Sequence, residues 1–326
     1  MKKNLLVTGG SGRLGSYLCP FLQERGYNVA NFDQVPPQMG TPLANVPFIK
    51  GDFSDLGECM RAISIAQPDV IIHLAALASH TELLPFFAKE YDTAITTGYR
   101  PMQRLPEDTT MRVNTMGTFY IFDAARRMGV KDIIFASSYF TLGIGFRLSG
   151  TSFEPAYLPI DENHPNLPED SYSLSKVLGE EIAKSFARAY GIRSIGLRFL
   201  GVYFDYVEMS RKNREKEFGA TVPQANEKEL NMLTGKTYQY VDARDIALAI
   251  DLAINKIGSP EFELFEPFFL STDTLYPEPT TEVIAKRWPN LSEMGKDIKG
   301  TDGMISNEKA KRMLGFYPQH SWRDKK

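Results

Sequence analysis

A tyrosine and a lysine four residues apart are the pair in this sequence best suited to acid–base chemistry. In the run Tyr172-Ser173-Leu174-Ser175-Lys176, a helix would place both side chains on one face, one turn apart. A phenol with a pKa of about 10 is a poor base at neutral pH. A neighbouring ammonium group stabilises the phenolate and lowers that pKa. Tyr172 could then accept the proton of a substrate hydroxyl while a hydride leaves the same carbon.

A glycine-rich turn near the N-terminus is the second chemical signal. Its sequence is Thr8-Gly9-Gly10-Ser11-Gly12-Arg13-Leu14-Gly15. The start of a helix offers free N–H groups and a favourable dipole to a pyrophosphate. Gly9 permits the tight turn, Gly12 lets the backbone approach a diphosphate, and Gly15 lets helix and strand pack closely. An apolar strand precedes the turn and a helical pattern follows it, so the turn predicts dinucleotide binding.

An acidic residue at the end of the second predicted strand bears on which dinucleotide binds. The carboxylate of Asp33 can accept hydrogen bonds from both hydroxyls of the adenosine ribose, and it would repel a 2′-phosphate. NAD is therefore favoured over NADP. Arg13 is the counterargument, because a basic side chain in the loop can help to hold a phosphate. Its alternative is a side chain that faces solvent or the diphosphate.

Residues that follow later strands extend this candidate site. Asp52 and Phe53 follow the strand predicted at 48–50. Asp52 can bond the adenine amino group with Phe53 packed nearby, or it merely caps the next helix. Ser137 and Ser138 end another apolar run, and the carboxyl ends of strands line the ligand crevice in parallel sheets. Ser138 is expected to bond the reacting oxygen and Ser137 to touch the nicotinamide side.

Alternating apolar runs and helical patterns must position these groups. Strands are predicted at 5–8, 28–33, 48–50, 70–74, 133–137 and 194–199, and helices at 14–24, 56–66, 110–128 and 172–190. This order predicts a parallel sheet covered by helices on both faces. Right-handed crossovers make it a doubly wound (Rossmann) α/β fold.

The alternation stops after Phe204. Residues 205–236 are polar and irregular, with a mixed charge run at 211–217 that is typical of a solvated helix face or a mobile loop. A further helix is predicted at 242–255. We therefore expect a dinucleotide-binding domain over 1–200, to which 237–258 returns. The segments 201–236 and 259–326 should form a smaller C-terminal α/β substrate-binding domain.

The composition excludes several classes of protein. The 326 residues are 43% hydrophobic and carry a net charge of -3, which is not the balance of a nucleic-acid binder. No apolar run of about 18 residues predicts a membrane span, and no signal peptide is recognised. Cys19 and Cys59 are expected to be buried on helices, not to form a disulfide framework or a metal site. We predict a cytoplasmic protein.

Taken together, these motifs resemble the extended short-chain dehydrogenase/reductase family, the NAD-dependent epimerase/dehydratase group. The resemblance spans the chain in the family's order. Besides the motifs above, the matching segments are His73-Leu74-Ala75-Ala76, Asn114-x-x-Gly117-Thr118, Arg198-Phe199-Leu200-Gly201-Val202-Tyr203, Tyr240-Val241-Asp242-Ala243-Arg244-Asp245, Ser306-Asn307-Glu308-Lys309-Ala310 and Leu314-Gly315-Phe316-Tyr317-Pro318.

The resemblance implies roles for individual residues. Tyr172 would be the general acid/base, Lys176 would bind the nicotinamide ribose and tune Tyr172, and Ser138 would complete the catalytic set. His73 would stand beside the cofactor with a chemical or a structural role, and Asn114 would brace the sheet, position a water or make a helix side-chain bond. The expected cofactor-binding residues are Gly9, Gly12, Arg13, Leu14, Gly15, Asp33, Asp52, Phe53, Leu74, Ala75, Ala76, Asn114, Ser137, Tyr172, Lys176 and Phe199. The expected substrate-binding residues are Ser138, Tyr139, Gly201 and Arg244.

Departures from the family pattern narrow the chemistry. Tyr139 and Phe140 follow Ser138 where sugar 4,6-dehydratases have Asp-Glu, which argues against that elimination. Gly201 stands where nucleotide-sugar epimerases have an Asn, which puts a nucleotide diphosphate substrate in doubt. The segment 81–108 is longer than the family expects, and would be a lid, a dimer surface or an ordinary helix pair.

A loop before Tyr172 adds one finer resemblance. Residues 155–165 are similar to the Leu-Pro-x-Asp-Glu-x-His-Pro stretch of members near the uronate dehydrogenases, which oxidise a sugar acid and release NADH. Loop hydrogen bonding is the expected role of Glu162 and His164.

These observations predict an NAD-dependent epimerase or dehydrogenase that oxidises a secondary hydroxyl of a sugar, sugar acid or nucleotide sugar. The alternatives are a uronate-dehydrogenase-like oxidoreductase and a non-catalytic NAD(P)-sensing protein. The resemblance also implies a homodimer through helices 110–128 and 172–190.

Overall fold

The computed structural model describes residues 2–78, 108–145, 147–214, 216–222 and 237–324. Seven parallel strands form the larger sheet, in the order β3-β2-β1-β4-β5-β6-β9. The order reverses between β1 and β4, where doubly wound sheets bind their ligands. The predicted Rossmann fold is therefore confirmed. The strands are β1 (Asn4–Thr8), β2 (Asn28–Asp33), β3 (Phe48–Lys50), β4 (Val70–His73), β5 (Asp132–Ser138), β6 (Arg193–Phe199) and β9 (Phe265–Leu270).

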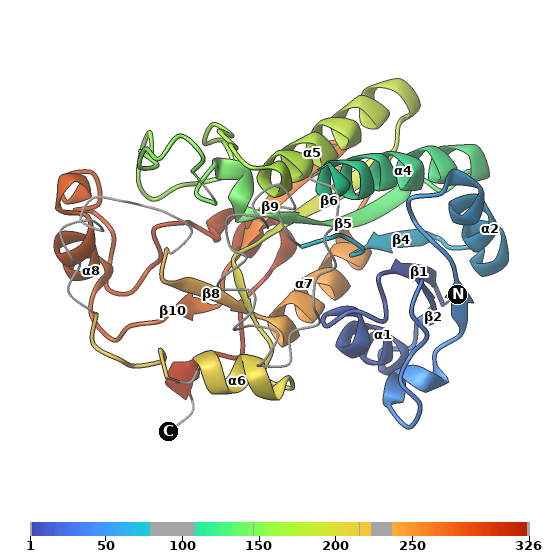
Figure 1. Cartoon of the computed structure of the whole chain (residues 1–326), viewed down its shortest axis with the longest axis horizontal. Coiled ribbons are helices and arrows are strands. Elements are labelled where there is room, and N and C mark those ends of the chain that lie inside the picture. Colours follow the sequence, from blue (N-terminus) through green and yellow to red (C-terminus); the bar gives the residue numbers. More distant parts are fainter. Residues whose placement is uncertain (1, 79–107, 146, 215, 223–236, 325–326) are drawn as a thin grey trace.

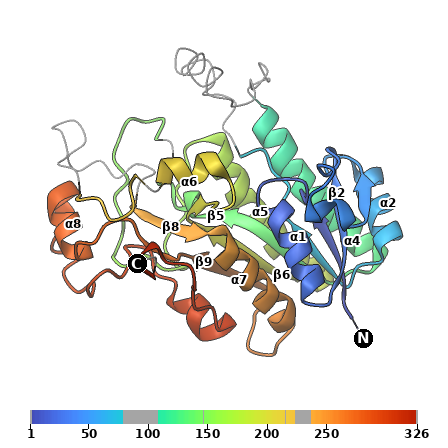
Figure 2. The same cartoon turned by 90° about the horizontal axis from the view of Figure 1, so that it is seen from below.

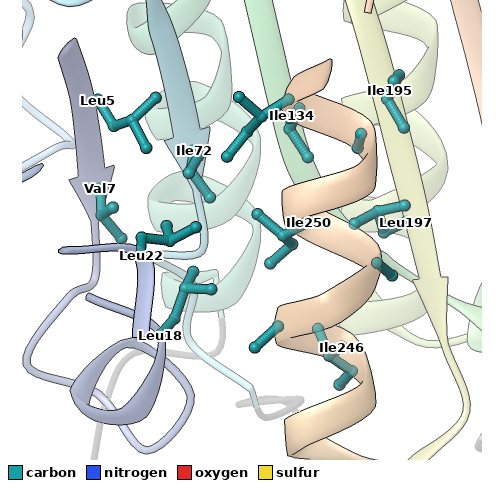
Figure 3. Close-up of a cluster of buried hydrophobic side chains, with 14 of the residues drawn as sticks. Leu5, Val7, Leu18, Leu22, Ile72, Ile134, Ile195, Leu197, Ile246 and Ile250 are labelled. Atoms are coloured by element: carbon teal, nitrogen blue, oxygen red, sulfur yellow. The ribbon is translucent and has the colours of Figure 1, made fainter. Parts of the chain in front are cut away.

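Helices cover both faces of this sheet (Figure 1). On one face lie α1 (Gly15–Glu24) and α7 (Ala243–Lys256), and on the other α2 (Leu56–Ala66), α4 (Gly117–Met128) and α5 (Ser171–Tyr190). Successive residues of a strand point to opposite faces. In β1, Leu5 and Val7 accordingly join the core under α1 and α7 (Figure 3), whereas Leu6 joins the core under α2, α4 and α5.

A second, smaller sheet carries the rest of the chain. Its order is β10-β8-β7, from β7 (Gly201–Tyr203), β8 (Gln239–Asp242) and β10 (Asp273–Thr274). The short helices α6 (Glu208–Arg214) and α8 (Thr280–Arg287) accompany it. Figure 2 shows α8 at the end of the molecule opposite α2, with β8 between α8 and the larger sheet. Tyr203, Tyr240 and Trp288 contribute to its own buried core. This is the expected smaller C-terminal α/β unit.

Strand pairing corrects the expected domain boundaries at two places. β8 opens the segment 237–258 but pairs with β7 and β10 in the smaller sheet. β9 lies in the segment 259–326 but pairs with β6 in the larger sheet. The physical reason is the alternation of β9, since Phe268 and Leu270 face the core under α1 and α7 and Phe269 faces the core of the smaller unit. One strand serves both units.

The helix predicted at 110–128 is also not uniform. Met111–Met116 winds as a π-helix before α4 begins at Gly117. The charge run at 211–217 falls partly on α6, where an exposed Lys212–Glu208 ion pair fits the predicted solvated face. Cys19 and Cys59 are buried free thiols, as expected. Among the described residues, no helix has the length and apolar character that a membrane crossing needs.

Candidate active site

The glycine-rich turn joins β1 to α1 and packs against the segment after β4. Gly9 has a φ of +72°, and a Cβ there would lie 2.8 Å from the Ala75 backbone. A Cβ on Gly15 would overlap the backbone of Gly10. The Gly12 N–H donates to the Gly9 carbonyl at 3.0 Å, and a Cβ on Gly12 would lie 3.1 Å from that oxygen. Gly9 and Gly15 therefore have no room for a side chain, and Gly12 has little.

Asp33 ends β2 with its carboxylate folded back on the glycine turn. It accepts hydrogen bonds from the backbone N–H groups of Ser11 and Val35, each at 3.0 Å. The Arg13 guanidinium lies 5.0 Å from the centre of the Phe204 ring. The basic group of the loop thus packs on the segment after β7, which weakens the argument for a 2′-phosphate.

Asp52 and Phe53 lie in the turn between β3 and α2. Asp52 accepts hydrogen bonds from the N–H and hydroxyl of Ser54, at 2.8 and 2.7 Å. The alternative that Asp52 caps the helix is wrong, because Asp55 immediately precedes α2 and accepts from the Glu58 N–H at 2.9 Å. The Phe53 ring lies 5.5 Å from the ring of His73, which ends β4.

The structure brings Ser138, Tyr172 and Lys176 together. Ser138 is the last residue of β5, and Tyr172 and Lys176 are one turn apart at the start of α5. The Tyr172 hydroxyl shares a hydrogen bond with the Ser138 side chain. The Lys176 ammonium donates to the Ala136 carbonyl at 2.8 Å and lies 5.6 Å from the centre of the Tyr172 ring. α5 thus presents the pair to the carboxyl end of β5.

Burial controls the charge of this group. Desolvation raises the pKa of Tyr172 to about 12, the hydrogen bond from Ser138 opposes it, and Asp170 adds to it. Because Ser138 Oγ already accepts the Phe140 N–H at 3.2 Å, its own proton is free to be donated to the phenol oxygen. Desolvation lowers the pKa of Lys176 to about 8, against the opposing charge of Glu180. The sequence predicts that the neighbouring lysine lowers the pKa of Tyr172. In the protein without a bound cofactor, burial outweighs that effect and the pKa is raised.

His73 lies between two buried hydroxyl groups. Its Nδ1 lies 2.7 Å from the Thr8 hydroxyl and its Nε2 lies 3.2 Å from the Thr118 hydroxyl. Burial lowers the pKa of His73 to about 3, and the Lys176 charge acts in the same direction. The ring is therefore neutral and links β1, β4 and α4.

The segment after β4 is held from two sides. The Leu74 N–H donates to the Thr8 carbonyl at 3.1 Å, and the Ala75 N–H donates to the Thr8 hydroxyl at 3.3 Å. Asn114 makes both hydrogen bonds to the Leu77 backbone, at 2.8 and 3.0 Å, and donates to Ser175 Oγ at 3.1 Å. Asn114 is thus a brace between this segment and α5, and Ala76 lies in the braced segment.

Two of the predicted site residues, Ser137 and Tyr139, point into packed interfaces. Ser137 Oγ donates to Glu180 at 2.6 Å in the interface between β5 and α5, so this side chain does not face the nicotinamide side. Tyr139 is 8% exposed and packs in the core of the smaller unit, so its expected contact with substrate stays a prediction. Ser137 points to α5 because successive strand residues face opposite sides, whereas Tyr139 lies in the helical turn Tyr139–Leu142 after β5 and packs inward there.

The remaining predicted residues lie at the boundary of the two units. Phe199 ends β6 in register with Ser138, and Gly201 opens β7. Arg244 pairs with Asp242 at 2.7 Å and with Asp205 at 3.1 Å, and the bond to Asp242 raises the pKa of the guanidinium. Its charge is therefore already compensated within the protein.

Glu180 and Arg198 were not assigned roles from the sequence. They form a buried ion pair behind the catalytic residues, with contacts at 2.7 and 2.9 Å. The sequence spacing could have indicated Glu180, because residues 172, 176 and 180 are four apart and lie on one face of a helix.

The loop at 155–165 holds itself in place. The Ala156 N–H donates to His164 Nε2 at 2.9 Å, and Glu162 accepts the Phe269 N–H at 2.8 Å. These contacts confirm the expected loop role of Glu162 and His164. The predicted insertion at 81–108 lies, apart from Asp108, outside the described residues. Within the described residues, no cluster of three His, Cys, Asp or Glu could hold a metal ion.

Comparison with known proteins identifies the class. Residues 5–84 and 90–265 match the model of the NAD dependent epimerase/dehydratase family. The chain belongs to this family and is an NAD-dependent enzyme of the extended short-chain dehydrogenase/reductase type. This confirms the resemblance inferred from the motifs, and with it the expected cofactor.

Individual relatives show how far the likeness extends. A putative UDP-glucose 4-epimerase of Methanocaldococcus jannaschii is 31% identical over 200 residues, which cover 61% of this chain and 56% of that protein. The UDP-glucose 4-epimerase of Rhizobium meliloti is 25% identical over 335 residues, covering 97% and 93%. The Thermotoga maritima UDP-glucose 4-epimerase, solved with UDP-glucose, aligns with a TM-score of 0.62 at 22% identity over 98% of this chain and 94% of that one. At that identity the solved structure supports the fold alone.

Proposed function

We propose that this protein oxidises a secondary hydroxyl group of a carbohydrate with NAD, using Tyr172 as the general acid/base. The observation that carries the proposal is the hydrogen bond between Tyr172 and Ser138 at the end of β5, with the Lys176 ammonium beside the ring. A hydroxyl group placed at this pair could pass its proton directly to the phenol oxygen.

The glycine turn supports the cofactor assignment. A Cβ at Gly9 or Gly15 would meet backbone atoms of Ala75 or of the turn itself, so glycine keeps the turn tight at the start of α1, and the N-terminus of a helix favours a diphosphate. Asp33 would bind the adenosine ribose, Asp52 and Phe53 would lie at the adenine, and Lys176 would bind the nicotinamide ribose. NAD supplies the hydride acceptor when bound.

The chain's own residues account for the proton transfer. Tyr172 must lose its proton before it can accept one, although burial raises its pKa to about 12. Ser138 stabilises the phenolate by donating a hydrogen bond, and the Lys176 charge acts through the ring face. A positively charged cofactor would strengthen the same effect. Catalysis therefore depends on Lys176 staying protonated.

The fate of the oxidised sugar decides between two activities. If the ketone stays and is reduced again on its other face, the enzyme is an epimerase, and relatives named UDP-glucose 4-epimerase favour this outcome. If the product leaves, the enzyme is a dehydrogenase, and Gly201 in place of the expected Asn favours a sugar or sugar acid without a nucleotide. Mass spectrometry of the purified, denatured protein separates the two. Near-stoichiometric NAD supports the epimerase, and an empty protein supports the dehydrogenase.

Replacing Tyr172 with Phe tests the mechanism itself. The variant removes one oxygen, so turnover of a sugar panel should fall by at least a factor of about 100 while NAD binding remains. Tyr190→Phe is the matched control, because Tyr190 is the last residue of the same helix and is 46% exposed. Full activity of Tyr172→Phe would refute the mechanism, and undiminished cellular function of a Tyr172→Phe/Lys176→Met variant would favour the NAD(P)-sensing alternative.

The proposal includes assembly and location. A homodimer would pack the outer faces of α4 and α5, where Met116 precedes α4, Phe119 lies on α4 and Leu174 lies on α5 with 37–40% of their surface exposed. A cytoplasmic location remains a prediction from the sequence.

A further inference from the structure

A buried carboxylate with three charged or polar donors lies behind the candidate catalytic residues. Glu180 on α5 and Arg198 on β6 are 1% and 3% exposed. The guanidinium donates to both carboxylate oxygens, at 2.9 and 2.7 Å. Ser137 Oγ donates to the same carboxylate at 2.6 Å. Charge-assisted bonds of this kind fix geometry more firmly than neutral ones.

The Glu180 carboxylate binds Ser137, the residue next to Ser138 in sequence, and lies one helical turn from Lys176. Tyr172, Lys176 and Glu180 occupy successive turns on one face of α5. Ser137, which binds Glu180, directly precedes Ser138, and Ala136, which binds Lys176, directly precedes Ser137. The Glu180 carboxylate therefore ties α5 to β5 at the position where the two elements must stay in register for Ser138 to reach Tyr172.

The charges around Lys176 make Glu180 important in a second way. Tyr172 and Glu180 face it from α5, and the neutral His73 faces it from β4. Asp170, at the start of α5, acts on Tyr172. Arg198 is engaged on its other side by the Glu162 carbonyl at 3.5 Å and by the Phe269 ring at 5.1 Å. Of these groups, Glu180 is the anion that favours a protonated Lys176.

We propose that Glu180 is a positioning residue, which holds β5 and α5 in register through Ser137 and Arg198 and keeps Lys176 protonated for the action of Tyr172. This inference rests on the proposed function, since it assigns Glu180 to the same proton transfer. It explains why a buried ion pair stands at this place. Such pairs are weak sources of stability, and an apolar pair of similar volume often stabilises a fold more.

The pH dependence of Glu180→Gln tests the proposal. Glutamine keeps the shape and one acceptor for Ser137 but loses the charge. The pKa of Lys176 should then fall, so the alkaline limb of turnover should move down by about one pH unit. Glu181→Gln is the matched control, because Glu181 is the next residue, half exposed and paired with Lys184 at 2.7 Å. That control should keep the wild-type profile.

A second readout does not depend on turnover. The rate of acetylation of Lys176 by acetic anhydride, followed by mass spectrometry against pH, reports when its amine becomes neutral. Lys184, on the exposed part of the same helix, serves as the internal reference. The midpoint for Lys176 should move down in Glu180→Gln and stay in place in Glu181→Gln. If the wild-type protein turns over no sugar, the proposed function fails, while acetylation still decides whether Glu180 controls Lys176.

Removal of one partner leaves Arg198 buried and unpaired, and this can unfold the variant. The double variant Glu180→Met/Arg198→Met removes both charges and should fold. It should shift the Lys176 midpoint downward as well, but by less, because the Arg198 cation is removed together with the Glu180 anion. A folded variant of either kind with an unchanged midpoint and an unchanged alkaline limb overturns the proposal. Failure of both variants to fold also overturns it, because the pair would then be a requirement for folding and not a positioning device.

Discussion

Burial sets the charge of the three titratable side chains closest to the proposed chemistry. It raises the pKa of Tyr172 to about 12 and lowers the pKa values of Lys176 and His73 to about 8 and about 3. Desolvation always disfavours the charged form, so acids and bases shift in opposite directions. At neutral pH this leaves a neutral His73, a protonated Tyr172 and a Lys176 close to its titration range. Small changes around Lys176 should therefore have large effects on activity.

His73 makes a prediction for stability against pH. Its pKa is lowered to about 3 in the folded protein and is about 6.5 in the unfolded chain. As the pH is lowered, His73 therefore binds a proton in the unfolded chain before it does so in the folded protein. The free energy of unfolding should fall by about 1.4 kcal/mol for each unit by which the pH is lowered between about 6 and 3. Urea unfolding of the wild type and of His73→Gln over this range measures it. The free energy of unfolding of the wild type should fall more steeply with decreasing pH than that of His73→Gln, because the variant lacks this titrating group. Equal pH dependence of the two proteins would contradict the prediction.

At the scale of elements, the turn between β1 and α1 depends on a contact with another strand. Gly9 combines a positive φ with so close a packing that a Cβ there would lie 2.8 Å from the backbone of Ala75, two residues after β4. The turn is therefore shaped both by its own backbone and by the neighbouring strand. In the same way, Asn114 of the π-helical turn ties the segment after β4 to α5. These contacts between elements fix the glycine turn and the segment after β4 relative to α5.

Two glycine variants separate backbone strain from this contact. Gly150 has nearly the same φ as Gly9, +71° against +72°, but nothing lies within 4 Å of its Cβ position. Gly150→Ala should cost about 1 kcal/mol of stability from φ alone. Gly9→Ala should cost clearly more and should also weaken NAD binding at least about tenfold, measured by calorimetry. Equal effects of the two variants on stability and NAD affinity would show that the Ala75 contact is unimportant.

At the scale of the whole molecule, two of the helices that cover one face of the larger sheet, α4 and α5, carry exposed apolar side chains. Phe119 on α4 and Leu174 on α5 are 37% and 39% exposed, and Tyr190 at the end of α5 is 46% exposed. The opposite face carries α1 and α7, and the smaller sheet caps the carboxyl ends of the strands (Figure 1). The outer face of α4 and α5 is thus available for self-association.

Light scattering tests the proposed homodimer. The wild type should have twice the mass of the chain, and Leu174→Glu should shift it to the monomer because a charge would be buried in the interface. Ile65→Glu is the control, because Ile65 lies on α2 and is 60% exposed. A monomeric wild type, or a Leu174→Glu variant that still dimerises, would contradict the proposed interface.

The sequence by itself determined the repeating elements and the chemistry they could support. Apolar runs with period two and helical runs with period 3.6 fix strands and helices locally, so six strands of the larger sheet were predicted within a few residues. The glycine turn and the Tyr172/Lys176 spacing are local as well, since each motif lies within one turn or one helix. Local signals of this kind survive without knowledge of the rest of the chain.

Only the tertiary structure decided which distant residues meet. β9 joined the larger sheet because its alternate side chains fit two cores, and no local pattern encodes that choice. Ser137 turned away from the crevice to meet Glu180, from a helix 43 residues further along the chain. Burial then set the pKa values of Tyr172, Lys176 and His73. Contacts between residues far apart in sequence, and the desolvation that they cause, arise only when the chain is folded.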